Sequence, residues 1–168
     1  FMSQTITIRK GLDIRMKGEA ERILSDAQRS SSFAIQPPNF IGTTPKLLVK
    51  EGEKVKAGTV LFFDKYRESI KYVSPVSGTI AEIVRGAKRR IMAVIITPDP
   101  EIEYEQQQIG DVQNMNREEV KQMMLDSGLW PFLKMRPIDI VANPQDSPKS
   151  IFISGFDSHP LSPDNDFI

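Results

Sequence analysis

The sequence contains no cysteine among its 168 residues, which excludes disulfides, iron–sulfur ligation and a thiol nucleophile in this chain. It also has no net charge, because 22 basic residues balance 22 acidic ones, so the composition does not favour nucleic acid as a partner. The longest purely apolar run, residues 91–96, is far shorter than the ~20 residues that a membrane-spanning helix needs. No secretory signal is visible, Met2 after Phe1 is expected to be the natural start, and the composition predicts a cytoplasmic protein.

Side chains that could bind a metal or catalyse a reaction are also scarce. His159 is the only histidine, whereas a zinc site needs three or four ligands. Asp157, Asp164 and Asp166 lie in a proline-rich segment without the spacing of a calcium loop. No nucleophile–base motif is present. We therefore expect no metal site, and no catalysis by this chain alone.

The first part of the sequence, residues 1–102, predicts a mainly β domain. Short segments rich in Val, Ile and aromatic residues alternate with turn residues, which is typical of a sandwich or barrel. Their connections are too short for parallel crossovers, so the strands are expected to be antiparallel. The expected strands are residues 5–10, 46–49, 59–63, 70–73, 79–84 and 90–97, separated by turns at Pro45, Gly52, Gly58, 75–78 and Gly86.

The second part, residues 103–168, predicts the helix, loop and first strand of an incomplete, Rossmann-like α/β domain. A helix is expected over residues 117–127, because Asn116 and Glu119 form a capping-box pattern and Gly128 is placed to end it. A proline-containing loop follows, and residues 150–155 have the apolar composition of a buried strand.

The first domain has a distinctive spacing of turns. Gly52, Val55, Gly58 and Leu61 alternate turn and core positions, and the turn at residues 75–78 leads into an alternating strand. This pattern resembles the lipoyl/biotinyl-type barrel-sandwich hybrid. A generic β-sandwich with common turns is the alternative, because turn chemistry is degenerate.

Carrier domains of this type present a modified lysine at a tight hairpin, and Lys65 stands at the corresponding place. The residues Tyr66, Arg67 and Glu68 are expected to lengthen and charge that hairpin, which would prevent recognition by a modifying enzyme. Lys65 is therefore expected to be an unmodified, solvated residue. A free-standing carrier domain modified on Lys65 remains the alternative function.

Several longer motifs follow one another along the chain, namely ITIRKGLDIRMKG, KLLVKEGEKVKAG, FFDK, VSPVSGTIAEIVRGAKRRIMAVII, DSGLWPFLKMRPID and IFISGFDSHPLSPD. In this order, from about Ile6 to Ile168, they resemble the N-terminal part of the A subunits of bacterial Na+-translocating NADH:quinone reductases. The resemblance implies a peripheral subunit on the cytoplasmic face of the bacterial inner membrane, whose partners are the other subunits. That complex couples electron transfer from NADH to quinone with Na+ export, and the resemblance places its FMN, FAD, iron–sulfur centre and NADH site in partner subunits.

Two sites follow as hypotheses. The first is contact with quinone at Phe40, Trp130, Phe132 and Arg136, since quinone heads bind in apolar slots with a few hydrogen-bond donors. The alternative is that these side chains seal a domain junction.

FMN and NADH are not expected to bind to residues 127–139, because bulky side chains replace the glycines that a phosphate-binding loop needs.

A basic cluster is the other candidate. It consists of Arg85, Lys88, Arg89 and Arg90 at a predicted hairpin turn. It could dock on an acidic partner surface or on anionic lipid headgroups, and a solvated turn is the alternative.

Overall fold

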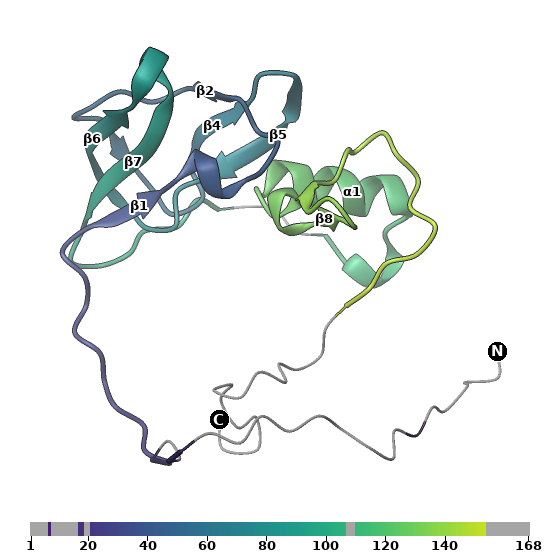
Figure 1. The fold of residues 1–168 in the computed structure, drawn as a ribbon, viewed down its shortest axis with the longest axis horizontal. Coiled ribbons are helices and arrows are strands. Elements are labelled where there is room, and N and C mark those ends of the chain that lie inside the picture. The colour runs from purple at the N-terminus through teal and green to yellow at the C-terminus, as the bar shows by residue number, and fades with distance from the viewer. Residues whose placement is uncertain (1–6, 8–16, 19–20, 107–109, 154–168) are drawn as a thin grey trace. The chain divides into compact units, whose positions relative to one another are not determined.

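The computed structural model describes residues 7, 17–18, 21–106 and 110–153. The chain divides into one unit of Phe1–Gln28 with Pro148–Ile168 and another of Arg29–Ser147. The second unit contains all of the helices and strands described below (Figure 1). In chain order they are β1 (Phe33–Ile35), the 3-10 helix η1 (Pro37–Asn39), β2 (Pro45–Leu47), β3 (Lys54–Val55), β4 (Val60–Asp64), β5 (Arg67–Val73), β6 (Gly78–Arg85), η2 (Ala87–Arg89), β7 (Ile91–Pro98), η3 (Val112–Asn114), α1 (Arg117–Asp126), η4 (Trp130–Phe132), β8 (Lys134–Met135) and β9 (Ile140–Val141).

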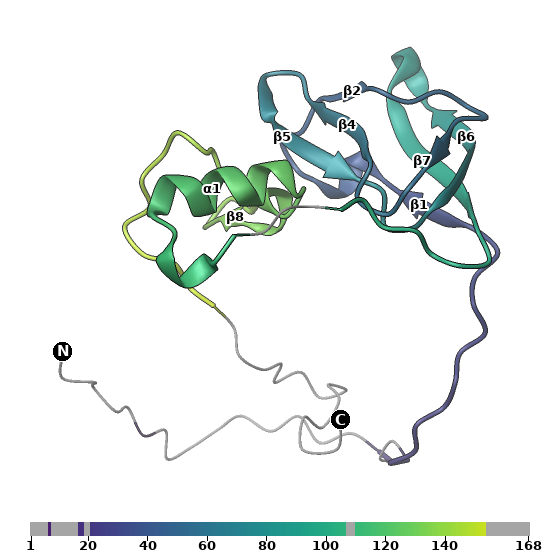
Figure 2. The same cartoon turned by 180° about the vertical axis from the view of Figure 1, so that it is seen from behind.

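Two antiparallel sheets form the β domain (Figures 1 and 2). In the described residues one sheet has the order β1-β7-β6-β3 and the other has the order β2-β4-β5. The longest pairing joins β6 and β7, with Ile80 opposite Ile96 and Ile83 opposite Val94. The predicted antiparallel strands from residue 46 to residue 97 are thereby confirmed, whereas the predicted strand at residues 5–10 lies outside the described residues apart from Thr7.

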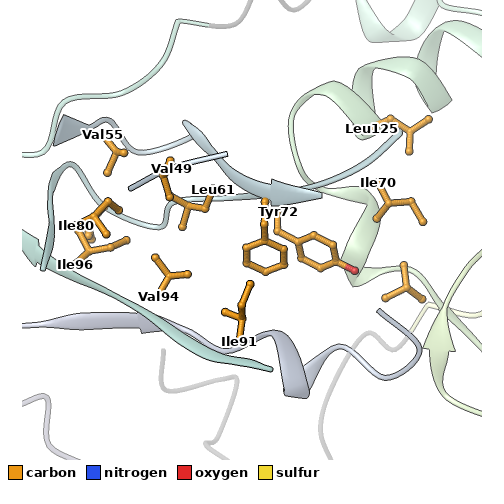
Figure 3. Close-up of a cluster of buried hydrophobic side chains, with 13 residues drawn as sticks. Val49, Val55, Leu61, Ile70, Tyr72, Ile80, Ile91, Val94, Ile96 and Leu125 are labelled. Atoms are coloured by element: carbon orange, nitrogen blue, oxygen red, sulfur yellow. The ribbon is translucent and has the colours of Figure 1, made fainter. Parts of the chain in front are cut away.

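Apolar side chains from both sheets meet in one core (Figure 3). Phe62 and Tyr72 are almost completely buried, and their rings stack with centroids 4.6 Å apart. The same cluster includes Leu125 of α1 and Val141 of β9, so it continues from the β domain into the segment that follows it. Its other buried members are Val49, Val55, Leu61, Ile70, Val76, Ile80, Ile91, Val94 and Ile96.

The predicted turn at residues 75–78 brings two strands into close contact. A Cβ atom on Gly78 would lie 2.1 Å from the carbonyl oxygen of Thr97, so only glycine fits at this start of β6. The Ser74 hydroxyl donates to the Val76 carbonyl oxygen at 2.6 Å, which satisfies a buried polar group within the turn. The turn therefore requires glycine at residue 78 because the backbone of Thr97 approaches it closely.

The chain leaves β7 through a strap, residues 99–105, that stays on the β domain. The buried Ser77 hydroxyl accepts from the Glu103 amide at 2.9 Å. Ala57 then donates to Glu103 O at 2.9 Å and accepts from the Glu105 amide at 2.8 Å. The strap is thus hydrogen-bonded to the β domain as far as Glu105, and the domain boundary at residue 102 stays a prediction.

The predicted helix is confirmed as α1, including both of its ends. Asn116 Oδ1 accepts from the Glu118 and Glu119 amides, and the Glu119 carboxylate accepts from the Asn116 amide at 2.7 Å, which completes the capping box. At the other end Gly128 has a φ of 73° and the Leu129 amide donates to Met124 O at 3.0 Å. This is the left-handed C-terminal cap that favours glycine.

The predicted buried strand at residues 150–155 is wrong for the part that the structure describes. Residues 150–153 form no strand, and Ile151, Phe152 and Ile153 are all exposed. Apolar composition favours burial, but a strand also needs a neighbouring strand to satisfy its backbone groups, and no described strand pairs with it. The predicted loop before it contains instead the hairpin of β8 and β9.

Candidate functional site

The hairpin between β6 and β7 ends in a strongly basic turn. Arg85, Lys88, Arg89 and Arg90, here called the basic tip, are all exposed. None of them makes an ion pair or a side-chain hydrogen bond with another residue in the described part of the chain. The tip therefore presents four positive charges that no described carboxylate neutralises.

The backbone of the basic tip has an unusual conformation. Lys88 and Arg89 have φ values of 54° and 60°, and the Arg90 amide donates to Ala87 O at 3.1 Å. This is the hairpin turn in which both central residues are left-handed, and it normally contains Asn-Gly. Left-handed backbone costs a residue with a Cβ atom about 1–2 kcal/mol. The predicted tight turn is confirmed, but its centre is Lys88-Arg89 and not the Gly86-Ala87 pair.

The four predicted quinone-contacting residues fall into two pairs. Phe40 and Trp130 pack against the core, and the Trp130 indole N–H donates to Ala142 O at 2.8 Å. Phe132 is 72% exposed, and the exposed guanidinium of Arg136 lies 3.4 Å from the Asp139 carboxylate. The indole donor is therefore already used within the chain, and contact with quinone stays a prediction.

The β4–β5 hairpin differs from the sequence prediction. Asp64 pairs directly with Arg67, so only Lys65 and Tyr66 form the turn. The expectation that residues 66–68 lengthen this turn is therefore wrong for Arg67 and Glu68, which lie in β5. The register of β4 and β5 nevertheless shifts directly after the Asp64–Arg67 pair. Arg67 was not predicted as a strand residue, because the predicted strand began at Ile70, whereas β5 begins at Arg67. Lys65 is exposed, and its ammonium lies 5.7 Å from the centre of the Tyr66 ring.

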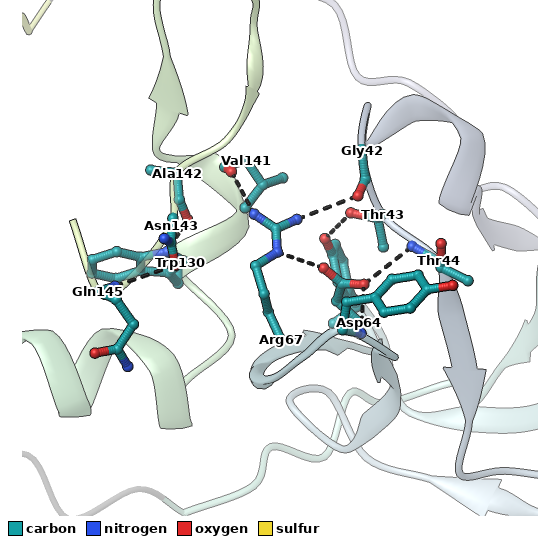
Figure 4. Close-up of polar contacts among 12 residues, drawn as sticks. Gly42, Thr43, Thr44, Asp64, Arg67, Trp130, Val141, Ala142, Asn143 and Gln145 are labelled. Atoms are coloured by element: carbon teal, nitrogen blue, oxygen red, sulfur yellow. Dashed lines mark hydrogen bonds and ion pairs between the residues drawn. The ribbon is translucent and has the colours of Figure 1, made fainter.

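Arg67 joins three separate segments (Figure 4). Its Nε lies 2.7 Å from Oδ2 of the fully buried Asp64, and its Nη1 donates to Val141 O at 2.9 Å. Nη2 reaches Gly42 O at 3.4 Å. The Asp64 carboxylate also accepts from the Thr44 amide at 3.2 Å, so the buried charge is both paired and hydrogen-bonded.

Two further contacts join β5 to α1 and to the segment before β2. Lys71 Nζ lies 2.6 Å from Asp126 Oδ1, and the hydrogen bonds from Lys71 and then Gln122 lower the pKa of the Asp126 carboxyl. The Tyr72 hydroxyl is hydrogen-bonded to the Thr43 hydroxyl. Burial raises the pKa of Tyr72, and the Thr43 hydrogen bond opposes that shift.

Within the residues that the structure describes, no group of three or more His, Asp or Glu side chains could hold a metal ion. His159, Asp157, Asp164 and Asp166 lie outside them.

The helices of the described part are short. None is both long and apolar enough to cross a membrane.

Comparisons with known proteins agree with this architecture. A family model described as the NqrA N-terminal barrel-sandwich hybrid domain matches residues 6–99. A second, described as the NqrA second alpha/beta domain, matches residues 115–168. The predicted barrel-sandwich hybrid followed by an α/β domain is thereby confirmed.

Relatives named as the A subunit of Na(+)-translocating NADH-quinone reductase match most of this chain. The one from Vibrio vulnificus (strain YJ016) is 33% identical over 159 residues, which are 94% of this chain and 36% of the relative. Those from Photorhabdus laumondii and Histophilus somni are 33% and 36% identical, over 97% and 94% of this chain and 37% and 36% of the relatives. The chain thus spans little more than a third of the length of these relatives, and with its two matched domains in this order it belongs to the NqrA family.

Proposed function

We propose that this chain is part of a peripheral subunit of a Na+-translocating NADH:quinone reductase, the complex that couples electron transfer from NADH to quinone with Na+ export. The observation that carries the proposal is the order of two NqrA domain matches, supported by relatives that are 33–36% identical along 94–97% of the chain. Its partners are the other subunits, and its place is the cytoplasmic face of the bacterial inner membrane.

In this proposal FMN, FAD, the iron–sulfur centre and NADH bind to the partner subunits. The backbone of residues 128–133 supports this placement, because phosphate groups bind to free N–H groups. The amides of Gly128, Leu129, Phe132 and Leu133 instead donate to the carbonyl oxygens of Leu125, Met124, Leu129 and Trp130. Pro131 has no N–H to offer, so this segment is poorly suited to hold a flavin or nicotinamide phosphate.

Quinone contact belongs to the same proposal and concerns two residues. Phe132 and Arg136 have exposed side chains, one apolar and one a hydrogen-bond donor, which is the combination that a quinone head needs. A photoreactive quinone added to the intact complex should label this segment. Labelling that stays unchanged with Phe132→Ala and Arg136→Ala would contradict this part.

The experiment that tests membership of the reductase uses the full-length protein. A tagged copy is purified from detergent-solubilised membranes of its own bacterium, and the co-purifying proteins are identified by mass spectrometry. The expected result is the set of reductase subunits, together with Na+-stimulated NADH oxidation that is lost when the gene is deleted. Purification without these subunits, or unchanged activity after deletion, would overturn the proposal.

A carrier function is the second candidate, because the two-residue β4–β5 turn places Lys65 where carrier domains present their lysine. Tyr66 is 75% exposed and adjoins Lys65, so a bulky side chain stands at the position where small neighbours are usual. Intact-mass spectrometry after co-expression with lipoate and biotin ligases decides between the two. We expect an unchanged mass, and a lipoyl or biotinyl increment on Lys65 would favour the carrier function.

A further inference from the structure

The basic tip combines exposed charge with a costly backbone. Lys88 and Arg89 occupy the two left-handed positions of the turn, where Asn-Gly would fit at little cost. A turn that is only solvated needs neither a basic side chain nor a Cβ atom at these positions. Residues with rarely populated φ/ψ values are found mainly at functional sites, where the surrounding structure keeps them in that conformation.

The tip is also held firmly in place. The β6–β7 ladder continues to the pair Arg85–Ile91, and the Gly86 amide donates to Arg90 O at 2.7 Å at the base of the turn. Two strands of eight residues each support it. The Cα positions of its charged residues are therefore fixed relative to one another, as they are in a surface that recognises a fixed pattern of charges.

The geometry points to an acidic protein surface as the partner of the basic tip, namely a cluster of Asp and Glu carboxylates on another subunit of the complex. This inference rests on the proposed membership of the reductase. Three of the four residues are arginines, whose planar guanidinium groups pair with carboxylates in a bidentate manner. A fixed set of guanidinium groups fits a fixed set of carboxylates.

An anionic lipid surface fits the tip less well. Stable attachment to a bilayer needs an apolar or lipid anchor in addition to basic residues. Of the two large apolar residues that follow the turn, Ile91 is buried and Met92 is only 38% exposed. The 22 basic residues, these four included, only balance 22 acidic ones, so the rest of the chain is net acidic and would be repelled by an anionic membrane. Headgroups are also fluid and gain nothing from a rigid arrangement.

The test is reassembly of the full-length protein with membranes from a strain that lacks its gene. The variant Arg85→Glu, Lys88→Glu, Arg89→Glu is compared with the unaltered protein and with Lys50→Glu, Lys54→Glu, Lys149→Glu, which changes the charge equally at other exposed lysines. We expect the tip variant to associate about tenfold or more slowly at low salt. Its difference from the unaltered protein should shrink as salt rises, because screening weakens exposed pairs. The control should associate at the unaltered rate.

A parallel arm uses vesicles with and without phosphatidylglycerol. Cosedimentation of the unaltered protein with anionic vesicles, lost in the tip variant while reassembly is unchanged, would overturn the inference in favour of lipid. Equal reassembly of the tip variant and the unaltered protein at every salt concentration would also overturn it and leave a solvated turn. Equal thermal unfolding of the two proteins excludes misfolding as the cause of a slow rate.

If the chain is not part of the reductase, the experiment gives a result that differs from failure of the docking inference alone. In that case the unaltered protein itself does not associate with the membranes, and the docking inference fails with it. Association of the unaltered protein together with an unaffected tip variant contradicts the docking inference alone.

Discussion

Gly128 lies so close to Val73 that a Cβ atom on Gly128 would stand 2.5 Å from Val73 Cγ1. The glycine that ends α1 is therefore required twice, by its left-handed φ of 73° and by its contact with β5. Helix C-termini commonly use glycine for the first reason alone. Here the cap is also the point where the helix packs on the strand.

Gly128→Ala should lower the free energy of unfolding by about 2–4 kcal/mol, because strain in φ and steric overlap add. Gly52→Ala is the matched control, since Gly52 has a φ of 82° and nothing within 4 Å of an added Cβ; it should cost only about 1 kcal/mol. Urea denaturation measures both. Adding Val73→Ala to Gly128→Ala should recover part of the loss, and equal effects of the two glycine variants would contradict the packing account.

Arg67→Met should cost about 3–5 kcal/mol, because it leaves the buried Asp64 carboxylate without its cation. It also removes the donors to Val141 O and Gly42 O. Arg136→Met is the control: that guanidinium is exposed beside Asp139, so its loss should change stability by at most about 0.5 kcal/mol. The comparison uses denaturant midpoints, provided that the free energy of unfolding depends equally on denaturant concentration in both variants. Similarly small losses of unfolding free energy in the two variants would show that the Asp64–Arg67 pair contributes little.

Tyr72 should make stability depend on alkaline pH. Burial raises its pKa in the folded chain, so above about pH 10 the unfolded chain loses this proton while the folded chain retains it. The free energy of unfolding is therefore unaffected by this group below about pH 10, and falls as pH rises through the folded-state pKa. Urea midpoints across this range should fall less steeply for Tyr72→Phe than for the unaltered chain. Parallel slopes would mean that the alkaline loss comes from other groups.

Replacing Lys88 by Asn together with Arg89 by Gly should raise the free energy of unfolding by about 1 kcal/mol, because Asn-Gly suits both left-handed positions. The same replacement at Lys65 and Tyr66, where neither residue has a positive φ, is the control and should be destabilising. Thermal unfolding measures both variants. A loss of stability at the basic tip would contradict the backbone strain inferred there.

Local patterns predicted much of this fold. Alternation in residues 79–84 and 90–97 predicted β6 and β7, and Asn116 with Glu119 predicted the start of α1, because strand periodicity and helix capping depend on nearby residues. The strand predicted at residues 150–155 was wrong over residues 150–153 for the opposite reason. Their apolar composition indicates burial, but strand formation depends on a partner that the segment itself does not specify.

The functional features divide in the same way. The exposed, charged turn at the basic tip could be predicted from its composition, whereas the left-handed backbone of Lys88 and Arg89 could not, since those residue types seldom adopt it. The role of Arg67 also depends on contacts with Val141, 74 residues away, and Gly42, 25 residues away. Such distant partners leave no signal in a short motif.

Strand β5 serves two groups of contacts through alternate residues. Ile70 and Tyr72 are buried in the core, whereas Lys71 and Val73, which alternate with them, contact α1 and Gly128. Arg67, which contacts β9, lies beyond a shift in the β4–β5 register. Because side chains alternate along a strand, a slip by one residue would misplace both sets at once. The two family-matched segments therefore both pack against β5, so unfolding of β5 would disrupt both of them. On heating, Arg29–Ser147 should absorb heat in a single transition whose calorimetric and van't Hoff enthalpies agree.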